Sequence, residues 1–462
     1  MKNKNKITFL NFLSNLLLRG ISIFSAPVFS RLLGTSGYGI VSVYNVWTKI
    51  LGVVLPMQSN LTLVNARVEY PEEEQDKYQS SVLALSMLGF LAAGGLCTVF
   101  LNPISEALNL PKMLLFMMLL QAFGNFATSF AGSKYTYEFK AGRNFVMSVG
   151  VTLASLGLSL ALVLSLPQED RYLGRIWGNV IVYAGLGLIL ALGVLRRGRT
   201  FFRPDYWKFC LTLALPMVFY SLSDMILAQS DQVMLQTMLD SNSVGLYSLA
   251  YTFSNVLFTI FHSLNNTWAP FFFEDMKNGE RDKVHSSAVN FLELFTILAM
   301  GFVLLTPEVF RLYAGKDFWG GMVLVPVFST GYFLNFLCTY PVNYDYYRKQ
   351  NKAVAVITIS CALVNIGLNY VLIRWLGVVG AALATTTSHL LQLTMHHIYA
   401  SHFLGKEDYP FPVRLWGGYG VCYLVVLALS YLLTDTWLIR WALGAMLGVW
   451  ELLRIRKRRG LL

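Results

Sequence analysis

Residues 145–167 read FVMSVGVTLASLGLSLALVLSLP, a stretch that contains no charged side chain. Uncharged stretches of similar length cover residues 82–101 and 113–133. An α-helix rises about 1.5 Å per residue, so about 20 such residues span the hydrocarbon core of a bilayer. These stretches therefore predict helices that cross a membrane.

The composition of the whole chain extends this conclusion. Hydrophobic residues make up 55% of the 462 residues, charged residues make up 13%, and the mean hydropathy is +0.53. Soluble domains are about a quarter charged. A soluble fold could not bury so many apolar side chains, so we expect an all-α integral membrane protein.

The hydropathy pattern predicts about fourteen transmembrane helices joined by short loops. These loops leave no room for a separate catalytic domain. The predicted spans are 8–32, 37–66, 80–101, 112–132, 144–166, 173–195, 208–236, 243–272, 286–306, 321–341, 353–373, 377–398, 413–433 and 435–453.

The N-terminal segment is interpreted as the first of these spans and not as a cleaved signal peptide. A basic stretch, residues 1–6, precedes an apolar run that continues to Leu33 without a small-residue cleavage pattern. The cysteines stand singly in apolar segments without a C-x-x-C motif, so they predict packing residues and neither disulfides nor a metal site. They are Cys97, Cys210, Cys338, Cys361 and Cys422.

The net charge of +11 could indicate nucleic-acid binding, but the placement of the charges favours another explanation. Most Lys and Arg residues lie in alternate loops, for example at 134–143, 196–208 and 454–459. By the positive-inside rule these loops and both chain ends are cytoplasmic, as in a multi-pass protein of the cell membrane. We expect no nucleic-acid partner. The opposite loops contain only Arg31, Lys112, Arg171, Arg175, Arg311, Lys316, Arg374 and Arg440.

Two turns indicate an internal repeat. Residues 33–42 (LGTSGYGIVS) and 239–248 (LDSNSVGLYS) share Leu, Gly and Ser at the same spacing, six spans apart. Both turns then enter the membrane from the same side, as in transporters whose halves are related by an axis along the membrane normal. We predict six-helix lobes at 1–200 and 201–404, followed by two additional helices and a basic cytoplasmic tail at 405–462.

Four spans carry stripes of polar residues at helical spacing. Lipid cannot satisfy their hydrogen bonds, so these residues must face protein or water. For the neutral residues two interpretations remain open, a hydrated cavity and helix packing through hydrogen bonds. The stripes are Asn11, Asn15, Arg19 and Ser22; Ser42, Asn45, Lys49, Gly52 and Pro56; Asn255, Thr259, His262 and Asn266; and Thr385, His389, Gln392 and His396.

Arg19 and Lys49 lie roughly 15 Å or more from either end of their predicted spans, at about 1.5 Å per residue. Inserting such a charge costs at least about 2.5–3.5 kcal/mol, so a partner must compensate. One possibility is a salt bridge to Asp224 or Asp231, which share a face of the seventh span. The other is a substrate group.

Acidic groups inside spans also predict coupling to ions. Asp224, Asp231 or His262 could couple transport to protons or sodium. Glu293 in the ninth span has no evident partner in the sequence.

Several segments together resemble the Wzx-type polysaccharide flippases, which share a superfamily with the multidrug and toxin extruders. They are 30–34 (SRLLG) through 38–44, Leu215-Pro216, Asp231, 244–251 (VGLYSLAY) and 268–272 (WAPFF). The resemblance covers nearly the whole chain in length and hydropathy, and it is most specific over residues 216–272. It departs from the family at Gln232, where many members have a basic residue.

The resemblance implies a two-lobed transporter that moves undecaprenyl-diphosphate-linked oligosaccharide from the inner to the outer leaflet by alternating access. Its implied partners are this lipid-linked oligosaccharide, membrane lipids, a polysaccharide polymerase and glycosyltransferases. Arg19 and Lys49 would then hold the diphosphate, because Arg makes forked contacts with phosphate oxygens and Lys supplies a point charge. The glycan would be bound by Asn15, Asn45, Asn255, His262 and Asn266.

Two other functions stay under consideration. A cation-coupled multidrug extruder of the same superfamily would need an acidic cavity. A membrane-embedded glycosyltransferase or polymerase is less favoured, because the sequence has no D-x-D pair, metal-ligand cluster or large outer loop. We therefore expect a transporter and not an enzyme, with no catalytic residues, metal or cofactor.

Overall fold

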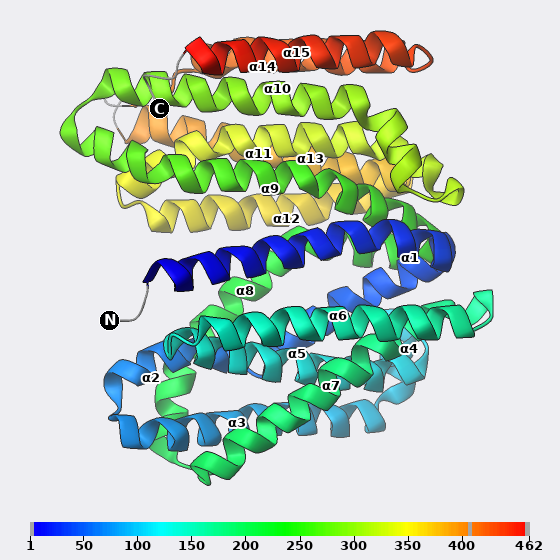
Figure 1. Cartoon of the computed structure of the whole chain (residues 1–462), viewed down its shortest axis with the longest axis vertical. Helices are drawn as coiled ribbons and strands as arrows, with labels where there is room; N and C mark the ends of the chain where they lie inside the picture. Colours follow the sequence, from blue (N-terminus) through cyan, green and yellow to red (C-terminus); the bar gives the residue numbers. More distant parts are fainter. Residues whose placement is uncertain (1–3, 405–408, 458–462) are drawn as a thin grey trace. The chain divides into compact units, whose positions relative to one another are not determined.

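The computed structural model describes residues 4–404 and 409–457, which are almost entirely helical (Figure 1). Short 3-10 segments lie at η1 (Ser59–Thr62), η2 (Gln168–Asp170) and η3 (Lys316–Val323), and a π-helical turn, η4, covers Tyr399–Phe403. The α-helices are α1 (Lys4–Val54), α2 (Leu63–Glu69), α3 (Glu72–Val99), α4 (Leu101–Leu108), α5 (Lys112–Tyr137), α6 (Ala141–Ser165), α7 (Arg171–Gly198), α8 (Pro204–Met238), α9 (Ser241–Asn278), α10 (Arg281–Tyr313), α11 (Leu324–Tyr347), α12 (Asn351–Leu376), α13 (Val378–Ile398), α14 (Val413–Leu432) and α15 (Trp437–Lys457).

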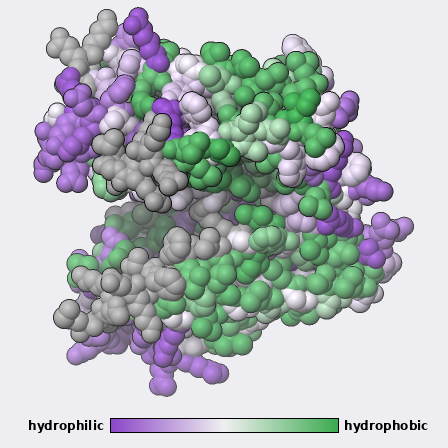
Figure 2. Space-filling view, turned by 45° about the horizontal axis from the view of Figure 1, so that its top comes forward, coloured by the Kyte–Doolittle hydropathy of each residue, from purple (hydrophilic) through white to green (hydrophobic). Residues whose placement is uncertain are grey.

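The predicted fold class, an all-α multi-pass membrane protein, is confirmed. Within the described residues, nine helices are long and apolar enough to cross a membrane, or up to ten if one bent pair forms a single span. Helices α8, α13 and α15 coincide with predicted spans without meeting that criterion. Figure 2 shows hydrophobic side chains over the middle of the helices and hydrophilic ones toward their ends, the pattern that a bilayer requires.

Contacts between residues divide the chain into two compact units, unit 1 at 1–245 and unit 2 at 246–462. The boundary falls at the start of α9, so α8 is grouped with the helices before it. Units defined by contacts between residues need not coincide with lobes defined by an internal repeat of the sequence. The lobes at 1–200 and 201–404 therefore stay a prediction.

Helix α1 contains the first predicted span and the first part of the second, and Gly34 separates them. Gly34 has φ 67° and ψ 179°, a conformation that a residue with a Cβ rarely adopts. The second predicted span, 37–66, is not one straight helix. The helix ends at Val54, and the chain resumes in η1 and α2 at an angle of 46°. Pro56 lies in the break and cannot supply the N–H that would continue the helix, and Met57 and Gln58 after it have φ 53°, which is not helical.

The two turns from which the repeat was predicted contact each other within unit 1. A Cβ on Gly39 would lie 1.9 Å from the carbonyl oxygen of Ser241, and a Cβ on Gly245 would lie 2.0 Å from that of Thr35. The contact is reciprocal, because Thr35 and Gly39 occupy the same places in the first turn as Ser241 and Gly245 in the second. Oγ1 of Thr35 also donates to Oδ1 of Asn242 at 2.8 Å. Only glycine allows this approach of the two backbones.

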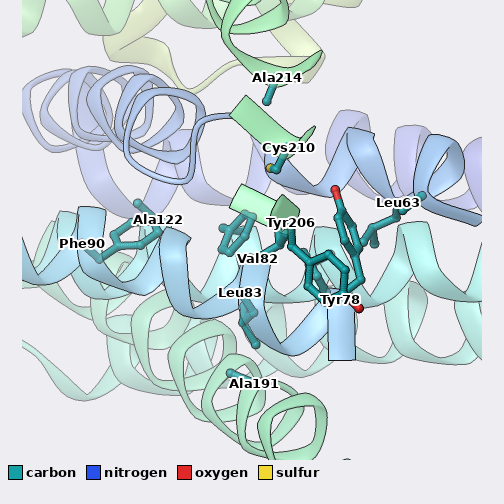
Figure 3. Close-up of a cluster of buried hydrophobic side chains, with 13 residues drawn as sticks. Leu63, Tyr78, Val82, Leu83, Phe90, Ala122, Ala191, Tyr206, Cys210 and Ala214 are labelled. Atoms are coloured by element: carbon teal, nitrogen blue, oxygen red, sulfur yellow. The ribbon is translucent and has the colours of Figure 1, made fainter. Parts of the chain in front are cut away.

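The core of unit 1 forms where α3, α5, α7 and α8 meet (Figure 3). Tyr78 and Tyr206 are both buried there, with ring centroids 5.4 Å apart. Each hydroxyl has a partner: Tyr78 contacts Oγ1 of Thr62 at 2.8 Å, and Tyr206 donates to Oε2 of Glu74 at 2.7 Å. Because these buried hydroxyls are satisfied, the aromatic core costs little in lost hydrogen bonds.

In unit 2, α14 and α15 pack against α10, as Figure 1 also shows. Two ion pairs hold this contact. Arg440, predicted to be a loop residue, is instead fully buried; it pairs with Glu308 and donates to the carbonyl of Leu304 at 2.8 Å. Glu293, which had no evident partner in the sequence, pairs with Arg454 of α15.

The cysteines follow the packing prediction with one exception. Cys97, Cys210, Cys338 and Cys361 are buried and free, whereas Cys422 is free and exposed. Cys422 lies on α14, where a thiol can face lipid as a small apolar group.

Candidate functional site

A polar cleft of about 640 Å³ lies within unit 1, between α1, α5, α6 and α7. Its polar residues recur at helical spacing on α5 and α6, so each helix turns one polar face toward the cleft. Among the described residues, no carboxylate and no cation lines it. The lining residues are Leu18, Asn125, Thr128, Ser129, Gly132, Ser133, Thr136, Tyr137, Asn144, Met147, Ser148, Val151, Thr152 and Tyr183.

The three threonine hydroxyls of the cleft donate their proton to carbonyls of their own helix. Thr128 donates to the carbonyl of Gly124 at 3.0 Å, Thr136 to Gly132 at 2.9 Å, and Thr152 to Ser148 at 2.8 Å. A hydroxyl that has donated its proton still has lone pairs, and these can accept. The cleft therefore offers hydrogen-bond acceptors together with the amides of Asn125 and Asn144, a combination that suits a ligand rich in hydroxyl groups.

The close approach of α5 and α7 positions one wall of the cleft. A Cβ on Gly124 would lie 2.3 Å from the carbonyl carbon of Tyr183, and a Cβ on Gly187 would lie 2.7 Å from Cα of Gly124. Small residues allow helix backbones to pack this closely in a membrane. Gly124 adjoins Asn125, and Tyr183 itself lines the cleft, so this contact sets the distance between the two walls.

A second, charged pocket of about 500 Å³ lies between α2, α3 and α5. It shares Tyr137 with the polar cleft. The loops that supply its charges belong to the set predicted to be cytoplasmic. Its lining residues are Leu63, Arg67, Glu72, Gln75, Asp76, Gln79, Lys134, Tyr137, Glu138 and Lys140.

Lys134 is the buried cation of this charged pocket. Its Nζ lies 2.9 Å from Oδ1 of Asp76 and 3.8 Å from Oε1 of Glu138, so two carboxylates share one ammonium. Lys140 neutralises Glu138 from the other side at 2.5 Å. Lys134 and Lys140 are thus paired with carboxylates, and Arg67 donates to the carbonyl of Tyr137 at 2.6 Å. Oε1 of Gln79 is buried there without a hydrogen-bond partner among the described residues. That atom could accept from a ligand.

The structure gives Lys49 a neutral partner. Its side chain is exposed, and Nζ donates to Oε1 of Gln229 on α8 at 3.1 Å. Asn45, one turn earlier on the same helix, is half-buried. Asp231 is buried on α8, two positions after Gln229. A neutral amide does not compensate the ammonium charge, which is therefore available to an anion.

Some predicted site residues lie outside the described part of the chain. The side chains of Asn11, Asn15 and Arg19 on α1, and that of Asp224 on α8, belong to this group. A salt bridge between Lys49 and Asp224, and the pairing of Arg19 with Lys49, stay predictions.

The predicted polar stripe of α9 lies in unit 2. His262 and Asn266 are exposed and stand 3.5 Å apart at Nδ1 and Nδ2, while Asn255 is half-buried. The neighbouring Asn265, which the sequence reasoning missed, accepts from Nδ2 of Asn343 on α11 at 2.7 Å. This stripe therefore has an exposed side and a side that joins α9 to α11.

On α13 the structure favours helix packing over a hydrated cavity for two residues of the stripe. His396 is fully buried, and Nε2 of Gln392 lies 3.5 Å from Oγ1 of Thr358 on α12. His396 contacts Asp345 on α11 at 2.7 Å. Among the described residues, no group of three or more His, Cys, Asp or Glu side chains is placed to hold a metal ion.

The sequence contained a signal for the polar cleft that the reasoning did not use. Asn125, Ser129 and Ser133 on α5 recur every four residues, as do Asn144, Ser148 and Thr152 on α6. These stripes resemble those on the spans that were singled out, but they include no charge. Because the prediction of the site started from cations inside spans, it did not include the neutral residues that form the cleft.

Comparisons with known proteins agree with this architecture. A sequence model of the family described as "Polysaccharide biosynthesis protein" matches residues 5–276, more than half of the chain. The match confirms the family resemblance predicted from the sequence. A curated relative, an uncharacterized membrane protein of Haemophilus influenzae, is 20% identical over 348 residues, which cover 74% of this chain and 83% of the relative.

Solved transporter structures share the fold. The lipid II flippase MurJ in an inward closed conformation superimposes with a TM-score of 0.73 at 17% identity, over 99% of this chain and 100% of that one. An inward-facing multidrug resistance transporter of the MATE family, from the MOP superfamily, gives 0.59 at 12% identity, over 83% and 93%. At sequence identities this low, structural similarity shows a shared fold and does not show a shared substrate.

Proposed function

Because the chain belongs to the polysaccharide biosynthesis protein family, we propose that it is a flippase for lipid-linked oligosaccharides. Its substrate is an undecaprenyl-diphosphate-linked repeat unit, which it moves from the inner to the outer leaflet of the cell membrane by alternating access. The product serves the assembly of a cell-surface polysaccharide. A glycosyltransferase that builds the repeat unit and a polymerase that joins the units are its functional partners.

The polar cleft of unit 1 is the observation that carries this proposal. Binding sites for small molecules typically measure about 300–1,000 Å³, and the cleft, at about 640 Å³, has room for a short glycan. A sugar presents many hydroxyl donors, and the cleft offers hydroxyl oxygens and amides as acceptors. A polar cleft of this size among membrane helices is costly unless a polar ligand or water occupies it.

Lys49 fits the diphosphate of the same substrate. An exposed ammonium group held by a neutral amide keeps its charge free for phosphate oxygens. Leu18, the neighbour of Arg19 in sequence, lines the cleft, so the backbone of Arg19 is close to it as well. We assign Arg19 the second contact with the diphosphate.

The multidrug extruder remains the competing function, because the same fold serves it. A cationic drug would need carboxylates in its cavity. None of the described residues that line the polar cleft is a carboxylate, and Lys49 would repel a cation. Both observations favour an anionic substrate rich in hydroxyl groups.

The test is flipping in reconstituted vesicles. A short-chain polyprenyl diphosphate that carries a fluorescent disaccharide is added, and the fraction protected from a membrane-impermeant quencher is followed over time. Loss of one charged hydrogen bond costs about 1.5–3 kcal/mol, so Lys49→Ala should slow flipping about 10- to 150-fold. Lys49→Arg should keep much of the rate.

Two comparisons make the test specific. Lys352→Ala removes an exposed lysine at the start of α12 and should flip at the wild-type rate. Ser148→Leu fills the polar cleft and should slow the glycosylated lipid more than the bare polyprenyl diphosphate. If wild-type protein transports a cationic dye and leaves the lipid-linked sugar in place, the extruder is the correct function.

A further inference from the structure

Unit 2 contains an ion pair with no exposed surface, between His396 of α13 and Asp345 of α11. Nδ1 of the imidazole lies 2.7 Å from Oδ2 of the carboxylate, and both side chains are 0% exposed. When Asp345 is ionised its carboxylate only accepts hydrogen bonds, and Nδ1 is then the donor. Within the described part of the chain, the remaining polar atoms, Oδ1 of Asp345 and Nε2 of His396, are buried without a hydrogen-bond partner. Buried atoms without partners are rare, and in a native protein they call for an explanation.

Protonation at one of these atoms changes the charge of the pair. While Nδ1–H donates to the carboxylate, Nε2 has a free lone pair and the pair carries one negative charge. A proton taken from water by Nε2 forms an imidazolium, and the net charge becomes zero. A net charge without water is unstable in a protein interior, whereas a hydrogen-bonded ion pair can be accommodated. The protonated state therefore suits the closed packing of α11 on α13, and the deprotonated state favours access to water.

Both helices depart from regular geometry close to the pair. Pro341 stands inside α11, four residues before Asp345, and removes one backbone N–H from the helix. Helix α13 continues directly into the π-helical turn η4 (Tyr399–Phe403), which begins three residues after His396. Such interruptions are points at which a helix bends, and π-helical turns are frequent at functional sites. A change in charge at the pair thus acts on two segments that are able to move.

A hydrogen bond near the pair joins α11 to α9, beside the polar stripe of α9. Asn343, two residues before Asp345, donates to Asn265, which adjoins the exposed Asn266. Helix α11 therefore holds the buried pair on one side and the α9 stripe on another. A movement of α11 reaches both, which is the physical requirement for coupling a proton to a substrate.

The titratable groups around the pair come from four parts of unit 2. Cys338 and Tyr409 interact electrostatically with Asp345, and Cys338 interacts with Cys361 of α12. The ring of Tyr344 packs against that of Tyr409, and the guanidinium of Arg348 lies 6.0 Å from the Tyr344 centroid. On α13, Nδ1 of His397 lies 3.2 Å from the hydroxyl of Tyr409.

We infer that the buried pair of His396 and Asp345 is the binding site for the proton that drives transport. This inference rests on the proposed function, because it names transport as the process that the proton drives. Binding of the proton by the pair is a separate property and can be measured without transport. A proton fits better than sodium, because hard cations prefer several oxygen ligands and this site offers one carboxylate beside an imidazole. Both residues lie near the helix ends that the loop charges predict to be cytoplasmic, where a proton would be released.

Two measurements on the full-length protein test the inference. The first records the nitrogen resonances of histidine-labelled protein between pH 5 and 9, with His396→Gln to assign the signals. The Nε2 resonance of His396 should change from that of a bare nitrogen to that of a protonated one as the proton binds, and Asp345→Asn should alter this change. The second follows flipping in vesicles with and without a pH gradient of one unit. The gradient should accelerate the wild-type protein up to about tenfold, since one unit is a tenfold difference in proton concentration.

The variants distinguish coupling from a structural role. Asp345→Asn and His396→Gln should flip at a rate that the gradient does not change, whereas His402→Gln, an exposed histidine of η4, should respond like wild type. A purely structural pair would lower both rates and preserve their ratio, which would overturn the inference. A His396 nitrogen that keeps one protonation state from pH 5 to 9 would overturn it too. Absence of flipping by the wild type would refute the proposed function and leave the titration result standing.

Discussion

Gly124→Ala should separate the two helices that form one wall of the polar cleft. The new Cβ would lie 2.3 Å from the carbonyl carbon of Tyr183, 2.4 Å from its oxygen and 2.6 Å from the nitrogen of Ala184. These atoms belong to the backbone, so no side-chain rotation relieves the clash. An ordinary contact needs 3.4 Å or more, and α5 and α7 must therefore move apart by about 1 Å.

The cost follows from this displacement. Overpacking of a well-packed interior costs about 1–3 kcal/mol, which is about a 5- to 150-fold change in the unfolding equilibrium. We expect the apparent melting temperature in detergent to fall by about 2–12 °C, at about 2–4 °C per kcal/mol. Because Asn125 and Thr128 move with α5, flipping of the glycosylated lipid should decrease at temperatures where the variant is still folded.

Gly157→Ala provides the matched control. This glycine lies inside α6, and no described atom lies within 4 Å of the position that its Cβ would take. The same substitution should therefore be neutral there or stabilise the helix by up to about 1 kcal/mol. Melting curves by intrinsic fluorescence and the flipping assay apply to both variants. A Gly124→Ala protein that is as stable and as active as Gly157→Ala would refute the close contact of α5 and α7.

Three further predictions concern other parts of the chain. Reporter fusions after Gly460 and within residues 240–243 should report opposite sides of the membrane, and a common side would contradict the topology read from the loop charges. Arg440→Met should lower the free energy of unfolding by about 3–5 kcal/mol, because it leaves carbonyls and a carboxylate of a buried ion pair without their donor. The variant should have a lower melting temperature and an α15 that is more sensitive to protease. A variant with unchanged values would contradict this prediction. Gly39→Ala and Gly245→Ala should destabilise unit 1 to a similar extent, since each contact is the reciprocal of the other, and thermal unfolding that is clearly unequal would argue against the paired turns.

The helices and their approximate ends could be predicted from residues that are near each other in sequence. A bilayer offers no hydrogen bonds to the backbone, so an apolar stretch such as 145–167 has to satisfy its amides within a helix. A turn between the first two spans was predicted at residues 33–42, and the structure places the break at Gly34 within it. The stop at Val54 was missed because Pro56 was counted as a member of a polar stripe. A proline alone does not end a helix here, since Pro27 lies inside α1, but the positive φ of Met57 and Gln58 does.

The candidate site was predicted in part. Lys49 was singled out as a cation inside a span, and its observed contact is the amide of Gln229 and not a carboxylate. The neutral residues of the polar cleft were overlooked. For the stripe that contains His396 the sequence left a hydrated cavity and helix packing open, and the structure buries His396 against Asp345, a residue that the sequence reasoning never considered.

The sequence by itself determined that this chain lies in a membrane, which stretches are helices, and which residues share a helix face. Hydropathy and helical periodicity are local properties, and a bilayer makes them decisive. Only the tertiary structure decided which faces meet. Glu293 and Arg454 are 161 positions apart, and Asp345 and His396 are 51 apart. No periodicity relates such pairs, because the rotation of one helix against another depends on close contacts between side chains, such as those of Gly124 with α7, that form only when the whole unit packs.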